Sequence, residues 1–228
     1  MAILVSELLR HRCVAVASGG AFEQFELQFL AKLPTNANFS NLFLFPTNCA
    51  SGYYYDNKLG RFQKAYDIRL GEREVKCIFR SFQAAFDEMG YVQPERTYGA
   101  ILENRGSQVT FSALGQKAPL HLKERWDPHQ RKRQRIRKLL KKYLPGFEIS
   151  IGGTTSIDVT KKGVNKTLCV KKLQQRLHIR KKDMLYVGDA LFKGGNDYIM
   201  KSAKITCTAV SNAEATKRLI RRIIASDK

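Results

Sequence analysis

Apolar positions near the two ends of the chain gather in short continuous runs, each followed by serine, glycine or proline. The runs are Cys13–Ala17, Asn41–Phe45, Met184–Val187 and Ile205–Val210. Such runs are typical of strands buried on both faces of a parallel sheet. Segments with helical periodicity alternate with them, at Ala2–His11, after Phe22, at Lys166–Leu177, at Asp197–Ser202 and at Ala213–Ala225. The alternation predicts an α/β sheet built from both ends of the chain.

The middle of the chain has a different pattern, in which polar and apolar residues alternate over short segments. Gly52–Gly60 predicts a hairpin with its turn at Asp56–Lys58. The other predicted elements are helices at Glu72–Glu88 and Gln130–Lys142 and strands near Tyr98–Glu103, Gln108–Ala113, Phe147–Ile151 and Ser156–Val159. Helices beside several antiparallel strands form an α+β module. We therefore predict a doubly wound parallel α/β core from residues 1–50 and 162–228, divided by an inserted α+β cap at residues 51–161.

Length, hydropathy and cysteine content limit the class of protein. The 228 residues, of which 43% are hydrophobic, are enough to bury one core or two smaller ones. No run of 18 apolar residues occurs, so no segment is predicted to span a membrane. Met1–Leu9 lacks the basic start of a signal peptide. The 5 cysteines form neither a CxxC pair nor a Cys/His cluster, which predicts free thiols in a reducing cytoplasm.

The chain is strongly basic. Its 40 Lys+Arg residues against 20 Asp+Glu give a formal net charge of +20, and such an excess attracts nucleic acid or phosphorylated small molecules. The densest basic block is Gln130–Lys142, in which Ile136, Leu139 and Leu140 recur at helical spacing. This pattern indicates an amphipathic helix with a solvated basic face. No aromatic residues are interleaved on that face to stack bases, so a phosphorylated small molecule is favoured over nucleic acid. The pattern does not indicate an oligomeric state.

The stretch Tyr186–Met200 carries the most informative candidate chemistry. Asp189 and Asp197 bracket a loop that contains Gly194 and Gly195, directly after an apolar run. Carboxylates just beyond the carboxyl end of a parallel strand can hold Mg²⁺ beside a phosphate. The alternative is a surface turn in which Asp, Asn and Gly only satisfy turn geometry.

A second candidate site follows the first apolar run. Ser18, Gly19 and Gly20 stand between Cys13–Ala17 and the helix that begins near Phe22. They offer a hydroxyl and backbone N–H groups to an anion. The alternative, in which Ser18 only caps the helix, is compatible with the same geometry. Because both candidate loops follow predicted parallel strands, we expect them to lie at the same edge of the sheet.

The order of these motifs resembles that of the haloacid dehalogenase (HAD) superfamily of phosphotransferases. The matching residues are Ser18-Gly19-Gly20, Lys166 after Gly163-Val164-Asn165, Gly188-Asp189 and Gly195-Asn196-Asp197, with the inserted module after the first motif. The cap resembles that of sugar-phosphate phosphatases and phosphomannomutases. Similarity to the eukaryotic-type phosphomannomutases is found in Glu103-Asn104-Arg105-Gly106, Ile149-Ser150-Ile151-Gly152-Gly153, Ser156-Ile157-Asp158-Val159 and Gly194-Gly195-Asn196-Asp197. The resemblance covers nearly the whole chain from Cys13 onward.

The resemblance implies a phosphate-binding role for the first motif and for the lysine. In this superfamily an aspartate attacks phosphorus, and Mg²⁺ neutralises charge on the transferring phosphoryl group. Ser18 is expected to bind the phosphate through its hydroxyl, with Gly19 and Gly20 adding backbone N–H groups. Lys166 is expected to pair with both the phosphoryl oxygens and the nucleophile. Without the neighbouring motifs, a lysine on a helix would be only a solvated cation.

The resemblance also implies a metal site, but the nucleophile motif does not occur in the sequence. Asp189 is expected to bind Mg²⁺ directly, Asp197 through a metal-bound water, and Asn196 to orient the loop or the phosphate. The superfamily motif Asp-x-Asp-x-Thr, on the central strand of the sheet, has no counterpart here, and no Asp-x-Asp occurs anywhere in the chain. We therefore expect an N-terminally truncated gene product. The alternative is a relative that has lost catalysis.

The cap departs from the phosphomannomutase pattern at one position. Ser112-Ala113-Leu114-Gly115-Gln116 stands where the family carries Ser-Pro-Ile-Gly-Arg. Gln116 thus replaces an arginine expected to bind a second phosphate, and Lys117 could substitute only as a point charge. Arg137 is expected to be a further cap arginine, and Ser156 and Asp158 are expected to contact the sugar.

Together these expectations describe a Mg²⁺-dependent phosphohydrolase that acts on a phosphorylated sugar or a similar small phosphate ester. We expect this enzyme to be inactive without the Asp-x-Asp motif. One alternative is a phosphomannomutase-type phosphotransferase. Another is a non-catalytic remnant that binds phosphate or nucleic acid through its basic surface.

Overall fold

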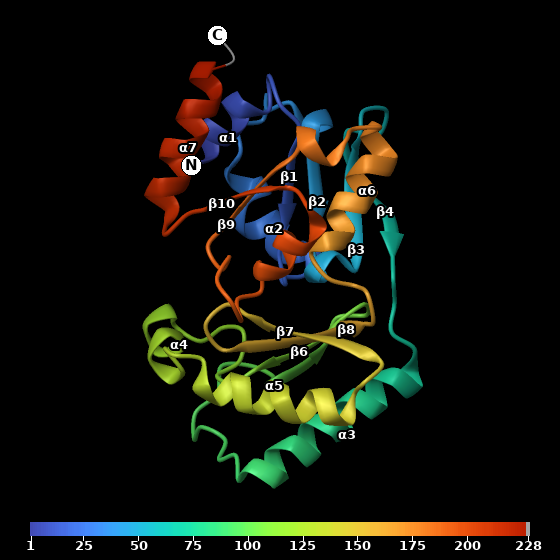
Figure 1. Cartoon of the computed structure of the whole chain (residues 1–228), viewed down its shortest axis with the longest axis vertical. Coiled ribbons are helices and arrows are strands. Elements are labelled where there is room, and N and C mark those ends of the chain that lie inside the picture. Colours follow the sequence, from blue (N-terminus) through green and yellow to red (C-terminus); the bar gives the residue numbers. More distant parts are fainter. Residues whose placement is uncertain (227–228) are drawn as a thin grey trace. The chain divides into compact units, whose positions relative to one another are not determined.

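Strands and helices form close to where the hydrophobic pattern predicts them. The computed structural model describes residues 1–226 and divides into a core unit, Met1–Asp67 with the chain from Lys166 onward, and a cap unit, Ile68–Asn165 (Figure 1). The core contains α1 (Ala2–Leu8), β1 (Val14–Ala17), α2 (Phe22–Gln28), β2 (Leu42–Phe45), β3 (Ser51–Asp56), β4 (Arg61–Asp67), α6 (Thr167–Leu177), β9 (Leu185–Gly188), β10 (Thr206–Ala209) and α7 (Ala213–Ser226). The cap contains α3 (Glu72–Met89), β5 (Leu102–Asn104), β6 (Val109–Ser112), α4 (Leu120–Trp126), α5 (Arg131–Tyr143), β7 (Phe147–Gly152) and β8 (Ser156–Lys161).

The core contains two separate sheets. In the larger one, β1 pairs with β2 in parallel, and β3 and β4 continue it as antiparallel strands in the order β1-β2-β3-β4. The smaller sheet consists of β9 and β10, again parallel. Within residues 1–226, β1 and β9 therefore each have one edge without a strand partner. The predicted parallel α/β class is confirmed. The two parallel strand pairs, β1–β2 and β9–β10, belong to separate sheets instead of one continuous sheet.

The predicted boundary of the cap is wrong at its N-terminal side. The pattern places residues 51–67 in the inserted module, but β3 pairs with β2 through Phe43–Tyr54 and Leu44–Tyr53 and so belongs to the core sheet. The hairpin pattern correctly indicated two antiparallel strands. Pairing between β2 and β3 could not be read from it, because period-2 alternation identifies a strand and not its neighbour.

Helices cover both faces of the larger core sheet. Leu42 and Leu44 point to the cluster that contains residues of α1, α2 and α7, whereas Phe43 and Phe45 point to the cluster that contains residues of α6. Alternate residues of a strand face opposite sides, so burial of all of β2 explains its continuous apolar sequence. The first and last helices, α1 and α7, pack side by side, so the two ends of the chain lie close together (Figure 1).

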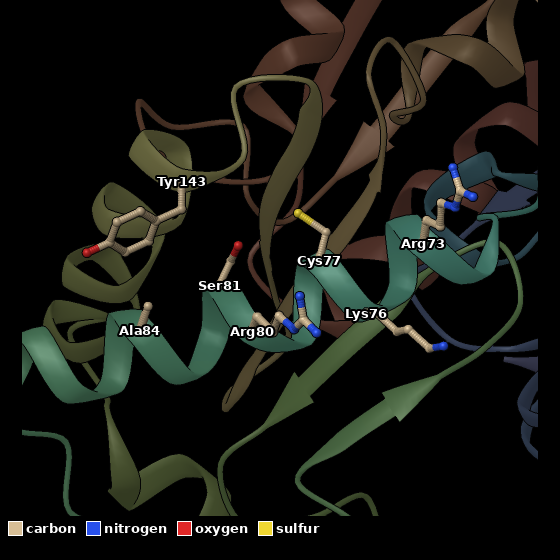
Figure 2. Close-up of a pocket in the computed structure, with 7 residues that line it drawn as sticks. All are labelled: Arg73, Lys76, Cys77, Arg80, Ser81, Ala84 and Tyr143. Carbon is tan, nitrogen blue, oxygen red and sulfur yellow. The ribbon is translucent and has the colours of Figure 1, made fainter.

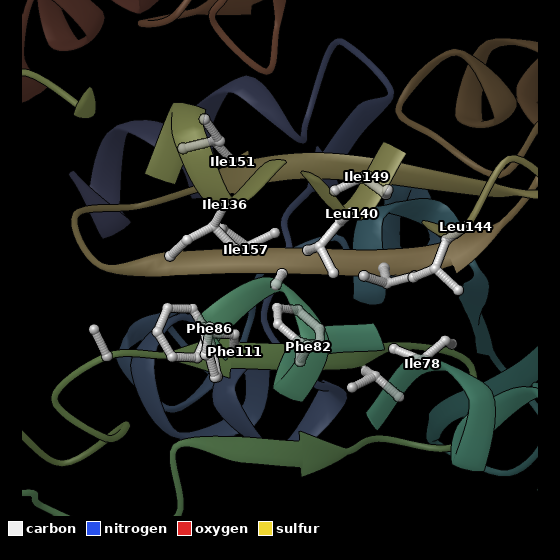
Figure 3. Packing of buried hydrophobic residues seen from close by; sticks show 14 of the residues in the cluster. Ile78, Phe82, Phe86, Phe111, Ile136, Leu140, Leu144, Ile149, Ile151 and Ile157 are labelled. Carbon is white, nitrogen blue, oxygen red and sulfur yellow. The ribbon is translucent and has the colours of Figure 1, made fainter. Parts of the chain in front are cut away.

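The cap is an antiparallel sheet with helices on one face. Its strand order is β5-β6-β8-β7, and α3 and α5 pack on one side of it (Figure 1). Figure 3 shows their apolar side chains, including Phe82 and Leu140, against Phe111 and Ile157 of the sheet. The stripes on α3 and α5 follow the helical period, which accounts for their packing on a single face.

The basic helix α5 is less uniformly solvated than predicted. Arg133 is 2% exposed, and its Nε lies 3.0 Å from Oδ2 of Asp127. Its Nη1 also donates to the carbonyl of Gly153 at 2.8 Å. Arg133 precedes Ile136 and Leu140 by three and seven residues, so it shares their buried stripe.

Within residues 1–226, no helix combines the length and the hydropathy that a membrane span requires.

Candidate active site

The candidate site centres on the carboxylate of Asp197, a residue that is buried. Its Oδ1 accepts a hydrogen bond from Nζ of Lys166 at 2.5 Å and another from the hydroxyl of Tyr186 at 2.5 Å. Its Oδ2 accepts one from the backbone N–H of Ala190 at 3.2 Å. Lys166 stands directly before α6, Tyr186 lies on β9, and Asp197 follows the glycine loop. The start of α6 and the segment from β9 to the end of the glycine loop thus meet at one carboxylate.

The electrostatics of this group favour the ionised aspartate. Burial by itself raises the pKa of the Asp197 carboxyl, but the positive charge and hydrogen bond of Lys166 and the hydrogen bond of Tyr186 lower it below its ordinary value. Burial and the bond to Asp197 raise the pKa of Tyr186, which stays a neutral donor. Tyr186 was not predicted. The available signal was its position two residues before Gly188, on the same side of the strand.

Two glycines make the loop conformation possible. A Cβ on Gly188 would lie 2.5 Å from Oδ2 of Asp197, and a Cβ on Gly195 would lie 2.1 Å from the carbonyl oxygen of Ala190. Side chains are therefore excluded at both positions while the carboxylate keeps its place. Close approach of other atoms is thus the physical reason for glycine at these two positions.

The predicted magnesium ligands form only part of a metal site. Asp189, the predicted direct ligand, is exposed, and both oxygens of Asp197, the predicted ligand through a water, already accept hydrogen bonds. Asn196, which is predicted to orient the loop or the phosphate, is half-buried. Within the described part of the chain, no three His, Cys, Asp or Glu side chains gather in a group that could hold a metal. Mg²⁺ takes six oxygen ligands in near-ideal octahedral geometry. These residues alone do not fit a Mg²⁺ ion, although HAD phosphotransferases generally use one.

The predicted phosphate loop is closed by its own hydrogen bonds. The Ser18 hydroxyl accepts a hydrogen bond from the N–H of Gly20 at 3.2 Å. The N–H of Gly20, one of the predicted phosphate donors, is therefore used inside the loop. The Ser18 carbonyl accepts from the N–H of Asn48, and the Gly20 carbonyl accepts from that of Thr47, each at 2.9 Å. The loops after β1 and β2 are thus joined, as expected for adjacent parallel strands. The roles of Ser18, Gly19 and Gly20 toward a phosphate remain predictions.

An unusual backbone follows β2 and was not predicted as part of the site. Thr47, Asn48 and Cys49 have φ values of 51°, 52° and 69°, and all are buried. Successive non-glycine residues in this region are uncommon and costly, and such strain tends to occur at functional positions. The Thr47 hydroxyl lies 3.1 Å from that of Ser51.

Two buried thiols connect this strained segment to Lys166. Cys49 and Cys169 both donate to the carbonyl oxygen of Lys166, with sulfur–oxygen distances of 3.8 and 2.9 Å. Burial raises the pKa of the Cys49 thiol, so it is not a ready nucleophile. Cys49 and Cys169 are both buried, and their hydrogen bonds support the backbone that positions the lysine.

Two of the predicted cap residues, Ser156 and Asp158, lie on strand β8. Ser156 and Asp158 alternate along β8 with Ile157 and Val159, which face the helices, so the polar pair occupies the helix-free face. Asp158 is 3% exposed, and its Oδ1 accepts from Nε2 of Gln108 at 3.0 Å and from the hydroxyl of Thr110 at 2.9 Å, both within the cap. Contact with a sugar stays a prediction for both.

Of the three other predicted cap residues, Gln116 and Arg137 form hydrogen bonds within the cap. Gln116 is half-buried, and its backbone carbonyl accepts a hydrogen bond from Nζ of Lys123 at 2.7 Å, while Lys117 is exposed. Arg137 on α5 donates from Nε to the carbonyl of Ile149 on β7 at 3.1 Å, and burial lowers the pKa of its guanidinium. Lys123, which already reaches Gln116, was not singled out from the sequence.

The fold and the loop after β9 place the chain among HAD-fold proteins, a class confirmed by solved structures. An N-terminally truncated IMP-nucleotidase of Plasmodium falciparum superposes with a TM-score of 0.69 and 16% identity, over 97% of this chain and 64% of that one. SMU.1108c from Streptococcus mutans UA159 superposes with a TM-score of 0.64 and 14% identity, over 98% and 90%. At such identities the likeness concerns the fold alone.

The chain belongs to the eukaryotic phosphomannomutase family, whose family model matches residues 1–226. Phosphomannomutase of Saccharomyces cerevisiae is 34% identical over 108 residues, which cover 44% of this chain and 40% of that protein. Phosphomannomutase 1 of Dictyostelium discoideum is 29% identical over 175 residues, or 70% and 68% of the two chains. The match thus spans less than half of the yeast enzyme, and the predicted family resemblance is confirmed.

Proposed function

We propose that this chain supplies the lysine–aspartate part of a HAD-type phosphoryl-transfer site, and that the complete site acts on a phosphorylated sugar or a similar small phosphate ester. The observation that carries the proposal is the buried group formed by Lys166, Asp197 and Tyr186 at the end of β9 in a chain of this family. A lysine ammonium has three donors. One is used on Asp197, so the others remain to bind phosphoryl oxygens.

In this proposal the hydrogen-bonded network around Lys166 keeps its charge in place for the transferring group. Tyr186 and Ala190 share the carboxylate of Asp197 with the lysine, which restricts the ammonium to one position. A fixed cation costs no reorganisation when negative charge develops on phosphoryl oxygens. Ser18 would reorient its hydroxyl toward the phosphate, and its bond from Gly20 would then be replaced by bonds from both groups to phosphate oxygens.

The proposal requires a strand bearing an Asp-x-Asp motif. One edge of β1 and one edge of β9 have no strand partner within residues 1–226, and both strands end at the candidate loops. A parallel strand inserted between them would pair their backbone groups and join the two core sheets. Its carboxylates would supply the nucleophile and, with Asp189, the oxygen ligands that Mg²⁺ needs.

Hydrolysis is proposed ahead of mutase activity because of the cap. Gln116 cannot form the bidentate ion pair that an arginine makes with a second phosphate. A bisphosphate intermediate would therefore be held less firmly in one orientation. Simple transfer of a phosphoryl group to water does not need that grip.

The test is Mg²⁺-dependent phosphate release from a panel of hexose monophosphates, a hexose bisphosphate and a nucleoside monophosphate. The 228-residue chain is compared with the same chain extended by a family strand that carries Asp-x-Asp. We expect turnover by the extended chain and background rates from the shorter one, a difference on the order of 10⁴ to 10⁶. In the extended chain, Asp189→Ala is expected to abolish turnover, and Asp183→Ala, which removes an exposed carboxylate of the same unit, is not.

Two outcomes would contradict the proposal. Turnover by the shorter chain that depends on Asp189 would mean that another group is the nucleophile. A folded extended chain that releases no phosphate from any substrate would mean that the site is not catalytic. If the extended chain prefers the nucleoside monophosphate, phosphoryl transfer is supported, and the proposed substrate class changes from a sugar phosphate to a nucleotide.

A further inference from the structure

A groove of about 460 Å³ runs along α3 in the cap unit and is not used by the proposed reaction. It is lined by Arg73, Lys76, Cys77, Arg80, Ser81 and Ala84 of α3 and by Tyr143 at the end of α5 (Figure 2). Its size lies in the range of small-molecule sites. The polar groups in it are mostly cationic, which sets the kind of ligand it can take.

The cations form one row. Arg73, Lys76 and Arg80 are spaced by three and four residues, so they lie on the same side of the helix. At 1.5 Å per residue, the row is about 10 Å long. All three side chains are exposed, and none forms an ion pair with another described residue. Like charges at this spacing repel one another and destabilise the helix, so a bound anion would relieve the repulsion.

Two neighbouring carboxylates, Glu74 and Glu88, have partners other than the three cations of the row. Glu74 accepts from the N–H of Gly71 at 2.6 Å and lies 3.3 Å from Nζ of Lys161. Glu88 accepts from the hydroxyl of Tyr143 and lies 3.5 Å from Nζ of Lys142. No carboxylate is among the residues that line the groove. The lining of the groove therefore carries three cations and no carboxylate, with the exposed Glu72 four residues before Lys76 on α3 and Glu88 at the Tyr143 end of the groove.

We propose that this groove binds a small molecule with two or three phosphoryl groups. Two guanidinium groups flank an ammonium, and each can form paired hydrogen bonds to one phosphoryl group. The hydroxyl of Ser81 offers a further donor at the buried side. Single-stranded nucleic acid is disfavoured because it needs a series of aromatic faces, and Tyr143 is the one ring in the lining, with its hydroxyl engaged by Glu88.

Cys77 provides a reporter inside the groove. It is an exposed free thiol between the cations, and Cys13, an exposed free thiol of the core unit, provides an internal reference in the same molecule. Alkylation of both thiols by iodoacetamide is followed by mass spectrometry at increasing concentrations of sodium tripolyphosphate or inorganic phosphate at constant ionic strength. We expect tripolyphosphate to slow alkylation of Cys77 at least about fivefold and that of Cys13 less than about twofold, with weaker protection by inorganic phosphate.

Matched variants separate a site from general attraction to a basic protein. The double variant Arg73→Gln/Arg80→Gln is expected to need at least about tenfold more tripolyphosphate for the same protection, since hydrogen bonds to charged groups are lost. The variant Arg131→Gln/Arg135→Gln removes two exposed arginines from α5 with the same change in net charge, and is expected to behave like the unmodified chain.

Three results would overturn the proposal. Equal slowing at Cys77 and Cys13, or equal loss of protection in both variants, would show diffuse attraction only. Better protection of Cys77 by a single-stranded oligonucleotide at equal phosphate concentration would assign the groove to nucleic acid. Thiol labelling involves no turnover, so this test is independent of the proposed phosphoryl transfer.

Discussion

Replacement of Lys166 by methionine tests whether the ion pair at the candidate site is a buried one. The side chains of Lys166 and Asp197 are 11% and 3% exposed, and their charged atoms lie 2.5 Å apart. Methionine keeps most of the side-chain length and removes the charge, so Asp197 would be left buried without a counter-ion. Breaking a buried pair in this way costs about 3–5 kcal/mol of unfolding free energy. The pair of Lys64, which is exposed, and Asp67, which is half-buried, is the control, and Lys64→Met is expected to cost about 1 kcal/mol or less.

The same variant is expected to reverse the pH dependence contributed by Asp197. In the unmodified chain the folded pKa of Asp197 lies below its ordinary value. Its contribution to stability is thus present above the ordinary pKa and is lost as pH falls through the folded pKa. Without the lysine, burial dominates and raises the folded pKa above the ordinary value. The free energy of unfolding of the variant then rises as pH falls toward the ordinary pKa of an aspartate. The difference in unfolding free energy between the unmodified chain and the variant therefore becomes smaller between pH 7 and pH 5.

Urea unfolding at several pH values measures both effects. Circular dichroism follows the whole chain, whereas fluorescence of the single tryptophan, Trp126, follows the cap. The loss should occur in the core transition, and Asp197→Asn in the Lys166→Met background should recover part of it, because the uncompensated charge is then gone. A deficit below 1 kcal/mol at pH 7, or one that does not change with pH, would refute the buried-pair reasoning.

Further predictions concern backbone contact and cap stability. Gly195→Ala is expected to destabilise the core by about 2 kcal/mol or more, because the new Cβ would lie 2.1 Å from a carbonyl oxygen. Gly146→Ala, where no atom lies within 4 Å, should change unfolding free energy by less than about 0.5 kcal/mol; equal effects in the urea midpoint would contradict the contact argument. Arg133→Met is expected to cost about 3–5 kcal/mol because it leaves Asp127, 4% exposed, without its cation. Trp126 fluorescence during unfolding measures this loss, and an unchanged midpoint would show that the pair is not stabilising.

The candidate site could be predicted in part because its signals are local. A strand end followed by Gly188-Asp189 and by paired glycines is visible along the chain, and the structure shows Lys166 and Asp197 in direct contact. Tyr186 was missed because a tyrosine within an apolar run usually indicates a packed ring. The strained segment at Thr47–Cys49 was missed because Thr and Cys carry no preference for positive φ.

What the sequence by itself determined is the set of elements, the α/β class, the insertion of an α+β module and the family, because these depend on periodicity, turn residues and motif order. Only the tertiary structure decided that the hairpin β3–β4 belongs to the core and that Arg133 is buried among the basic residues of α5. It also decided that the two parallel strand pairs form separate sheets. The physical reason is that strand pairing and burial of a charge depend on partners distant in sequence, and those partners are chosen by packing rather than by local pattern.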